Sequence, residues 1–232
     1  MLLEKLRLSK PNPHFSIGVV ADLRADSRIF HRCLDIRTDS VRMRCVSRFD
    51  STCFFIGHGM VMTMNTSASF STCDFCDAHK ADDSGDFRVL APVFKDFGGR
   101  TSFHGQVLTV KCYQDNSHVK KAVESDGLGR VLVVDGAGCL QRALLGGNLA
   151  AAAARHGWAG VVVYGCVRDL SEISVLPMGI RALALNPMPT VRADQGQTGV
   201  TVSVQGTLVH TGDWLYADSD GMVLSRHALH IS

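Results

Sequence analysis

The sequence lacks an apolar run long enough to cross a membrane and lacks a secretory signal. Its longest apolar-looking run, from Cys53 to Met62, is interrupted by His58 and two glycines, whereas a membrane-spanning helix needs about 20 apolar residues. The eight cysteines are scattered along the chain. Without a secretory signal, the simplest interpretation is reduced thiols in a cytosolic protein. We therefore expect a cytoplasmic protein that does not enter a membrane.

A clustered basic surface is also missing from most of the chain. The 24 Lys and Arg residues face 22 Asp and Glu residues. Ten of the basic and six of the acidic residues lie in residues 1–64, so residues 65–232 carry fourteen against sixteen. Binding to a phosphate backbone needs an excess of Lys and Arg on one surface. We therefore expect no nucleic-acid partner.

Two common ligand motifs are present only in part. Cys73 and Cys76 have the spacing of half a zinc site, but no second Cys pair or paired histidines follow, which favours packing of a helix face. Gly136-Ala137-Gly138 follows a predicted strand, but Gln141 stands where a dinucleotide-binding loop has its third glycine. Neither motif predicts its usual ligand here.

The composition, with 46% hydrophobic and 20% charged residues, is typical of a globular protein with one core or a core plus an appendage. Residues 1–64 show no sustained helical or strand period. Three interpretations compete for this N-terminal extension: an organelle-targeting segment, a poorly ordered tail, or upstream sequence absent from the functional protein. We expect a poorly ordered extension over 1–64 and a folded domain over 65–232.

A β-α-β order is predicted in the middle of the chain. Residues 130–135 and 160–164 read as apolar strands of the kind that is buried on both faces. Between them, residues 148–156 read as an alanine-rich helix capped by Asn148 and ended by Gly157. This order predicts a parallel pair of strands. Further elements are a short helix after Ser71 and strands over 107–110, 182–185, 200–204 and 207–209, with a hairpin of 214–217 and 222–224.

Two loops of this unit could form a ligand site, because loops at the carboxyl ends of parallel strands converge beside helix N-termini. Gly146-Gly147-Asn148-Leu149 could present backbone N–H groups to a carboxylate or phosphate. In Val167-Arg168-Asp169, the guanidinium of Arg168 could hold a carboxylate or a developing enolate, and Asp169 is a hard oxygen ligand for Mg²⁺ or Mn²⁺. Considered by spacing alone, the glycines are more often a turn and the Arg-Asp pair a surface ion pair.

Six segments in order resemble the RraA-like family, which holds both protein regulators of ribonuclease E activity and class II 4-hydroxy-4-methyl-2-oxoglutarate aldolases. The resemblance covers roughly Cys73 to the C-terminus. The matching segments are Phe97-Gly98-Gly99-Arg100, Thr109-Val110-Lys111-Cys112, Gly129-Arg130-Val131-Leu132-Val133-Val134-Asp135-Gly136, Gly146-Gly147-Asn148-Leu149, Gly165-Cys166-Val167-Arg168-Asp169 and Leu215-Tyr216-Ala217-Asp218-Ser219-Asp220-Gly221.

The resemblance implies an α/β fold, a compact layered β/β/α single domain of the swivelling-domain kind, assembled as a homotrimer. It implies a metal-dependent aldolase and oxaloacetate decarboxylase that releases pyruvate from 2-oxo acids. In this chain, Arg168 would be catalytic and would bind the pyruvyl group, and Gly146, Gly147, Asn148 and Leu149 would bind the substrate carboxylate. Asp169 would hold Mg²⁺ or Mn²⁺, with Glu172 ordering metal-bound water.

One position departs from the pattern of the bacterial aldolases. They carry an Asp with twenty residues between it and the Arg, and the corresponding residue here is Gly147. Proton transfer would then depend on another group, such as Asp135 or a residue of a neighbouring subunit, or activity would be reduced. The alternative function implied by the resemblance is a non-enzymatic regulator that binds a ribonuclease or helicase. Asp169 favours the enzyme and Gly147 favours the regulator.

Overall fold

A computed structural model describes residues 51–56, 59–64 and 70–230, with the backbone alone for the first two ranges. The chain divides into two units, Met1–Ser67 and Ala68–Ser232, which are described separately. In the first unit, β1 (Ser51–Ile56) pairs antiparallel with β2 (Gly59–Met64), with Ser51 opposite Met64. The sequence shows no strand period there, and the expected poor order of residues 1–64 stays a prediction.

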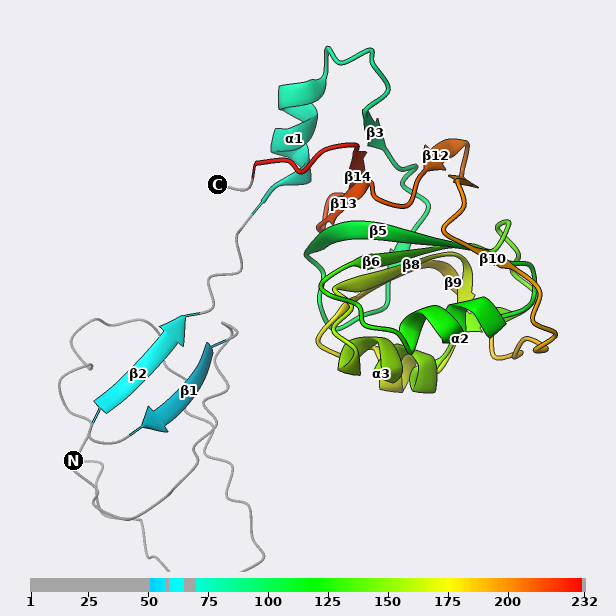
Figure 1. The fold of residues 1–232 in the computed structure, drawn as a ribbon, viewed down its shortest axis with the longest axis horizontal. Helices are drawn as coiled ribbons and strands as arrows, with labels where there is room; N and C mark the ends of the chain where they lie inside the picture. Colours follow the sequence, from blue (N-terminus) through cyan, green and yellow to red (C-terminus); the bar gives the residue numbers. More distant parts are fainter. Residues whose placement is uncertain (1–50, 57–58, 65–69, 231–232) are drawn as a thin grey trace, which may run out of the picture. The chain divides into compact units, whose positions relative to one another are not determined.

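The second unit is built on a ten-stranded sheet (Figure 1). Two of its strands lie off the main path, since β10 (Gln197–Thr198) pairs with β5 and β7 (Ala143–Leu145) pairs with β8. A separate pair is formed by β11 (Val202–Val204) and β12 (Thr207–Val209). Along the main path the strands are β3 (Phe87–Val89), β14 (Met222–Ser225), β13 (Trp214–Ala217), β5 (Phe103–Lys111), β6 (Val131–Asp135), β8 (Gly160–Val167), β9 (Gly179–Leu185) and β4 (Lys95–Asp96).

Four parallel strands, β5, β6, β8 and β9, form the centre of this sheet. The predicted parallel pair of β6 and β8 is confirmed, with Val131 opposite Gly160. All five residues of β6 are buried, as expected for a strand covered on both faces. The predicted hairpin of β13 and β14 is also present, with Ala217 opposite Met222.

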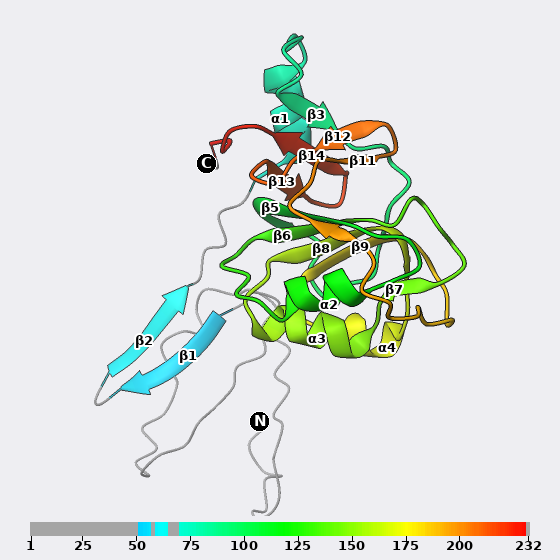
Figure 2. The same ribbon diagram turned by 45° about the vertical axis from the view of Figure 1, so that its right-hand side comes forward.

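The four central parallel strands separate two layers (Figure 2). Helices α2 (Ser117–Val123) and α3 (Gly147–Arg155) cover one face, and β11 to β14 lie on the other side. Successive side chains of a strand point to opposite faces, so Leu132 and Val134 pack with the alanines of α3 while Val131 and Val133 pack with β11 to β13. The expected β/β/α layering of an α/β domain is confirmed.

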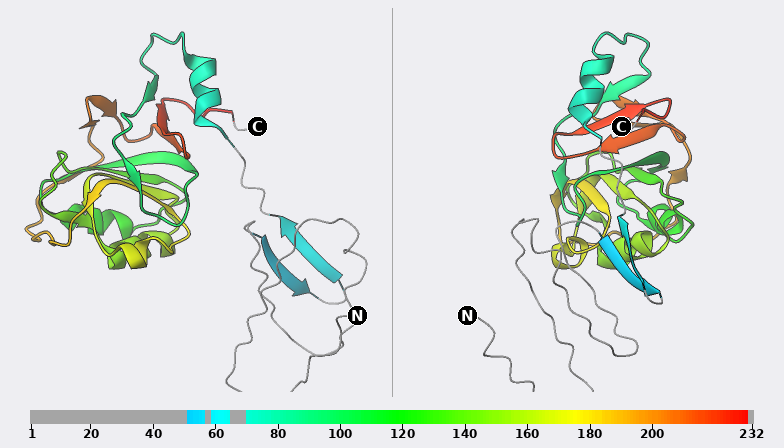
Figure 3. Two further views of the ribbon diagram at one scale, coloured as in Figure 1. Left: turned by 180° about the vertical axis from the view of Figure 1, so that it is seen from behind. Right: turned by 90° about the vertical axis from the view of Figure 1, so that its left-hand side faces the viewer.

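The first helix of this unit, α1 (Thr72–His79), is tied to the β13–β14 turn (Figure 3). Ser71 caps this helix, because its hydroxyl accepts the N–H of Asp74 at 3.2 Å. The carboxylate of Asp218 accepts both the N–H and the hydroxyl of Thr72 at 2.7 Å. It also accepts the N–H groups of Asp220 and Gly221 in its own turn. Within the described residues, no helix is both long and apolar enough to cross a bilayer.

We expect Asp218→Ala to lower the free energy of unfolding by about 2–4 kcal/mol. The substitution removes the carboxylate that accepts hydrogen bonds from Thr72, Asp220 and Gly221, and it leaves these donors without a partner. Burial raises the pKa of Asp218, but hydrogen bonds from Thr72, Asp220 and Gly221 outweigh it and hold the pKa below its usual value. The stabilisation is therefore present above the unfolded pKa and lost as pH falls through the folded one. Urea unfolding at neutral and acidic pH measures both effects, with Asp83→Ala as an exposed control. A loss equal to that of the control would contradict this account.

Candidate active site

Arg168 and Asp169 directly follow β8, at the carboxyl end of a central parallel strand. Asp169 is the N-cap residue of the short helix α4 (Leu170–Ile173) and has a left-handed backbone, with φ 62° and ψ 49°. Such a conformation is uncommon for a residue other than glycine and is often found at functional sites. The turn places the Asp169 carboxylate beside the start of α3.

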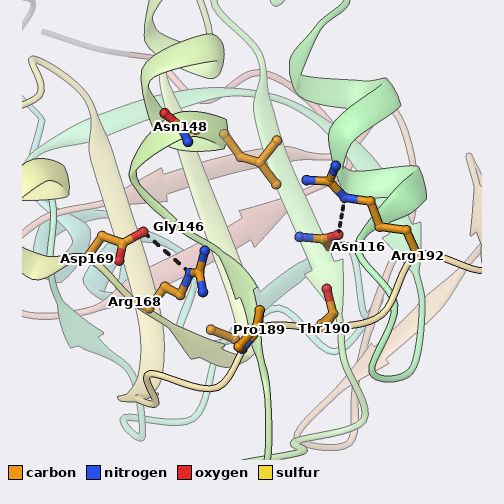
Figure 4. Close-up of a pocket in the computed structure, with 10 residues that line it drawn as sticks. Asn116, Gly146, Asn148, Arg168, Asp169, Pro189, Thr190 and Arg192 are labelled. Carbon is orange, nitrogen blue, oxygen red and sulfur yellow. Dashed lines mark hydrogen bonds and ion pairs between the residues drawn. The ribbon is translucent and has the colours of Figure 1, made fainter.

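The two loops singled out in the sequence lie together, as the β-α-β order predicts (Figure 4). Oδ2 of Asp169 accepts the backbone N–H of Gly147 at 2.9 Å. The same oxygen lies 3.4 Å from Nε of Arg168, and both side chains are about one third exposed, at 37% and 36%. The ion pair of Arg168 and Asp169 that the spacing suggests is therefore present, and it lies at the N-terminus of α3.

The start of α3 differs in one detail from the sequence prediction. Asn148 was expected to cap the helix, but α3 begins at Gly147, and Gly146 is its N-cap residue without a side-chain hydrogen bond. The carboxylate of Asp169 supplies the missing cap from another loop, which is why no local signal predicts it. The first helical bond runs from Ala150 N–H to the Gly146 carbonyl, so the N–H groups of Asn148 and Leu149 have no partner within the helix.

The two glycines are required by close approach. A Cβ atom at Gly146 would lie 2.7 Å from Oδ2 of Asp169 and 3.0 Å from Nε of Arg168. At Gly147 it would lie 1.8 Å from Oε2 of Glu172 and 2.7 Å from its Cδ. The carboxylate of Glu172 in α4 thus occupies the space into which a side chain at position 147 would extend.

A pocket of about 290 Å³ lies beside these loops. Five of the residues predicted to form a site line it: Gly146, Asn148, Leu149, Arg168 and Asp169. Gly147, which is buried, and Glu172, which is exposed, are not among the lining residues. Asp135, considered as a substitute proton donor, is buried at the end of β6, accepts the N–H of Ala137, and does not line the pocket either.

Sequence reasoning missed half of the pocket wall. The missed residues come from the loop before α2, from β7 and from the loop after β9. Two isolated parallel bridges, Asp115 with Val191 and Ala143 with Pro189, bring these segments together. No motif in the sequence marks these segments. The missed lining residues are Asn116, Ala143, Pro189, Thr190 and Arg192.

Comparison with known proteins identifies similar chains with different names. A protein from Albidiferax ferrireducens named "Putative 4-hydroxy-4-methyl-2-oxoglutarate aldolase" is 62% identical over 169 residues, which cover 69% of this chain and 98% of that protein. The RNA-processing inhibitor RraA from Thermus thermophilis is 42% identical with a TM-score of 0.66, covering 70% of this chain and 96% of its own. A solved S-adenosylmethionine:2-dimethylmenaquinone methyltransferase from Geobacillus kaustophilus is 36% identical with a TM-score of 0.65, covering 69% and 97%.

The family model described as RraA-like, Aldolase/RraA, matches residues 72–224. This range is more than half of the 232-residue chain and contains all six segments on which the sequence resemblance rests. It also contains every predicted site residue and every residue that lines the pocket. The chain belongs to the RraA-like family.

Proposed function

We propose that this protein is a divalent-metal-dependent carbon–carbon lyase that releases pyruvate from 4-hydroxy-4-methyl-2-oxoglutarate and from oxaloacetate. The observation that carries the proposal is the convergence of Arg168, Asp169 and the first turn of α3 on one pocket. The name of the Albidiferax relative, with 62% identity, supports the same chemistry. The three groups have complementary roles in cleaving a 2-oxo acid.

Both reactions break the bond between C3 and C4 of the substrate. In aldol cleavage, the C4 hydroxyl loses its proton and becomes a carbonyl, and the bonding electrons pass to C3 to form the enolate of pyruvate. In decarboxylation, C4 leaves as CO₂ and the same enolate forms. A proton added to C3 then completes pyruvate. The enzyme must therefore stabilise a negative oxygen and handle one proton.

Arg168 would stabilise the enolate oxygen, because a guanidinium forms strong charge-assisted hydrogen bonds to an oxyanion. The free N–H groups of Asn148 and Leu149 would bind the C1 carboxylate at the positive end of α3. Gly146 allows the backbone to lie close to the side chains of Arg168 and Asp169, since a Cβ at this position would collide with both. The substrate would thus be held at the carboxylate and at the 2-oxo oxygen.

Asp169 would hold Mg²⁺ or Mn²⁺. Its contacts to Gly147 and Arg168 both use Oδ2, so Oδ1 has no protein partner in the described part of the chain. That part contains no group of three or more His, Cys, Asp or Glu placed to hold a metal. A single carboxylate supplemented by water and substrate oxygens suits Mg²⁺, which retains several waters when bound. The cation would polarise the 2-oxo group as a Lewis acid.

Glu172 would position the water that handles the proton. Its carboxylate lies against Gly147, in the space where an Asp at position 147 would extend. A carboxylate that arrives from α4 can perform the water-orienting role that the aldolase pattern assigns to that Asp. Gly147 is then compatible with an enzyme, because the small residue leaves room for Glu172.

Metal removal tests this proposal directly. Protein treated with a chelator and then dialysed should release no pyruvate from either substrate above the uncatalysed rate, and added Mg²⁺ or Mn²⁺ should restore activity, because Asp169 by itself cannot polarise the 2-oxo group. A coupled lactate dehydrogenase assay follows the pyruvate. Ca²⁺, which prefers more ligands at longer distances, is the control cation. Pyruvate release that continues after complete metal removal would contradict the proposed cofactor. No pyruvate release with any of the added cations would contradict the proposed lyase function.

The similarity to the Thermus RNA-processing inhibitor supports a second candidate function, a regulator that binds a ribonuclease or helicase through its surface. The regulator function would be supported if such a partner co-purified in near-stoichiometric amounts with both the wild-type protein and Arg168→Ala. Loss of the partner in Arg168→Ala would not support it. Assembly as a homotrimer belongs to the proposal for either function. Sedimentation velocity measures it.

A further inference from the structure

A second guanidinium lines the pocket on the side away from Arg168. Figure 4 shows Arg168 with Asp169 on one side and Arg192 with Asn116 on the other. Leu149, Ala143 and Pro189 contribute apolar surface to the same wall. The pocket therefore presents two separated positive groups to one ligand.

The backbone that follows Arg192 is held by Asp115, which is only 2% exposed. Oδ2 of Asp115 accepts the N–H of Ala193 at 2.6 Å and that of Gln195 at 3.2 Å, and Oδ1 accepts the N–H of Ser117 at 2.7 Å. Burial by itself raises the pKa of Asp115, but its hydrogen bonds from Ser117, Ala193 and Gln195 lower it to about 2. A carboxylate that stays ionised thus anchors the Arg192 loop to the start of α2.

Polar atoms in this part of the pocket have unused bonding capacity. Nε of Arg192 donates to Oδ1 of Asn116 at 3.4 Å, and within the described residues its guanidinium forms no ion pair with a carboxylate. The hydroxyl of Thr190 is buried and has no hydrogen-bond partner there. Buried polar atoms in proteins are nearly always bonded, so an orphaned hydroxyl in a pocket wall points to a ligand.

We infer that Arg192 and Thr190 bind a second carboxylate of the substrate, so that the site selects 2-oxo dicarboxylic acids over 2-oxo monocarboxylic acids. The inference rests on the proposed use of the pocket for 2-oxo acids. A guanidinium binds a carboxylate through two parallel N–H donors, and the Thr190 hydroxyl donates to the same group. Asn116 orients the guanidinium by accepting from Nε, which leaves the terminal nitrogens for the ligand.

Binding of two matched ligands tests this selectivity without any turnover. 2-Oxoglutarate and 2-oxopentanoate have the same chain length and differ in the terminal carboxylate, and neither has the C4 hydroxyl that aldol cleavage needs. In calorimetric titrations with Mg²⁺ present, the wild-type protein should bind 2-oxoglutarate with a Kd that is on the order of 10- to 100-fold lower than its Kd for 2-oxopentanoate. In Arg192→Ala this ratio should fall close to one, and in Thr190→Val it should fall in part.

Arg155→Ala is the matched control, because Arg155 is exposed in the last turn of α3 and the substitution removes the same charge. It should keep the wild-type ratio. Equal binding of the two ligands by the wild-type protein, or a preference that survives in Arg192→Ala, would overturn the inference. If the protein prefers 2-oxoglutarate but releases no pyruvate from either substrate, the lyase function is contradicted and the role of Arg192 is still supported. The experiment therefore distinguishes failure of the lyase function from failure of the inference about Arg192.

Discussion

Replacing Arg168 by alanine is expected to lower kcat/KM for pyruvate release from oxaloacetate about 10²- to 10³-fold, the usual cost of losing one donor to a developing oxyanion. Arg168 borders the pocket beside Asp169, where it would face the oxygen that gains charge as the bond between C3 and C4 breaks. Because that charge is greatest in the transition state, most of the loss should appear in kcat. Steady-state kinetics with saturating Mg²⁺ measures both parameters.

Two further variants separate chemistry from charge and folding. Arg168→Lys keeps the charge but not the planar pair of donors, and we expect it to lie between wild type and Arg168→Ala. Arg155→Ala, which removes an exposed arginine from α3, should retain full activity. Wild-type kcat in Arg168→Ala, with the fold shown intact by circular dichroism, would exclude the proposed enolate-stabilising role.

Removing the Glu172 carboxylate should have the second large effect. Glu172→Ala is expected to lower kcat about 10²-fold or more, in the range for loss of a group that controls proton transfer. The expectation follows from the contact of Glu172 with Gly147, where an added Cβ would lie 1.8 Å from Oε2. Exchange of the methyl protons of pyruvate with deuterated water, followed by NMR, isolates the proton-transfer step from bond cleavage.

A compensating substitution gives this prediction its control. In Glu172→Ala, position 147 gains free space, so Gly147→Asp should restore part of the exchange rate by placing a carboxylate there from α3. In the wild-type background, Gly147→Asp must displace the Glu172 side chain and adds a like charge, so we expect no gain. If the double variant is no faster than Glu172→Ala, the two positions do not share one role.

Much of the fold could be predicted because strong local patterns report burial. The apolar runs of β6 and β8 are buried on both faces, and only a central parallel strand offers such an environment. The Asp-Gly turn after β13 likewise marks a hairpin from a few residues. The short elements β4, β7 and β10 escaped prediction, because each contains three residues or fewer and such a short segment shows no period.

The candidate site divides in the same way. Arg168, Asp169 and Gly146 to Leu149 were identified because each stands at the end of a predicted strand or the start of a predicted helix. Thr190 and Arg192 stand in a loop without a motif, and Asp115 reaches that loop only through the tertiary structure. Side chains that meet through separate loops leave no periodic signal in the sequence.

The amino-acid sequence by itself determined the family, the central β-α-β unit and the pairing of a guanidinium with a carboxylate beside glycines, since these depend on residue types at short spacing. Only the tertiary structure decided what caps α3, which carboxylate stands beside Gly147 and what forms the far wall of the pocket. Those outcomes depend on contacts between residues far apart in the chain, such as Gly147 with Asp169 and Asp115 with Ala193. Strand order and loop path set such contacts, and neither is encoded in a local pattern.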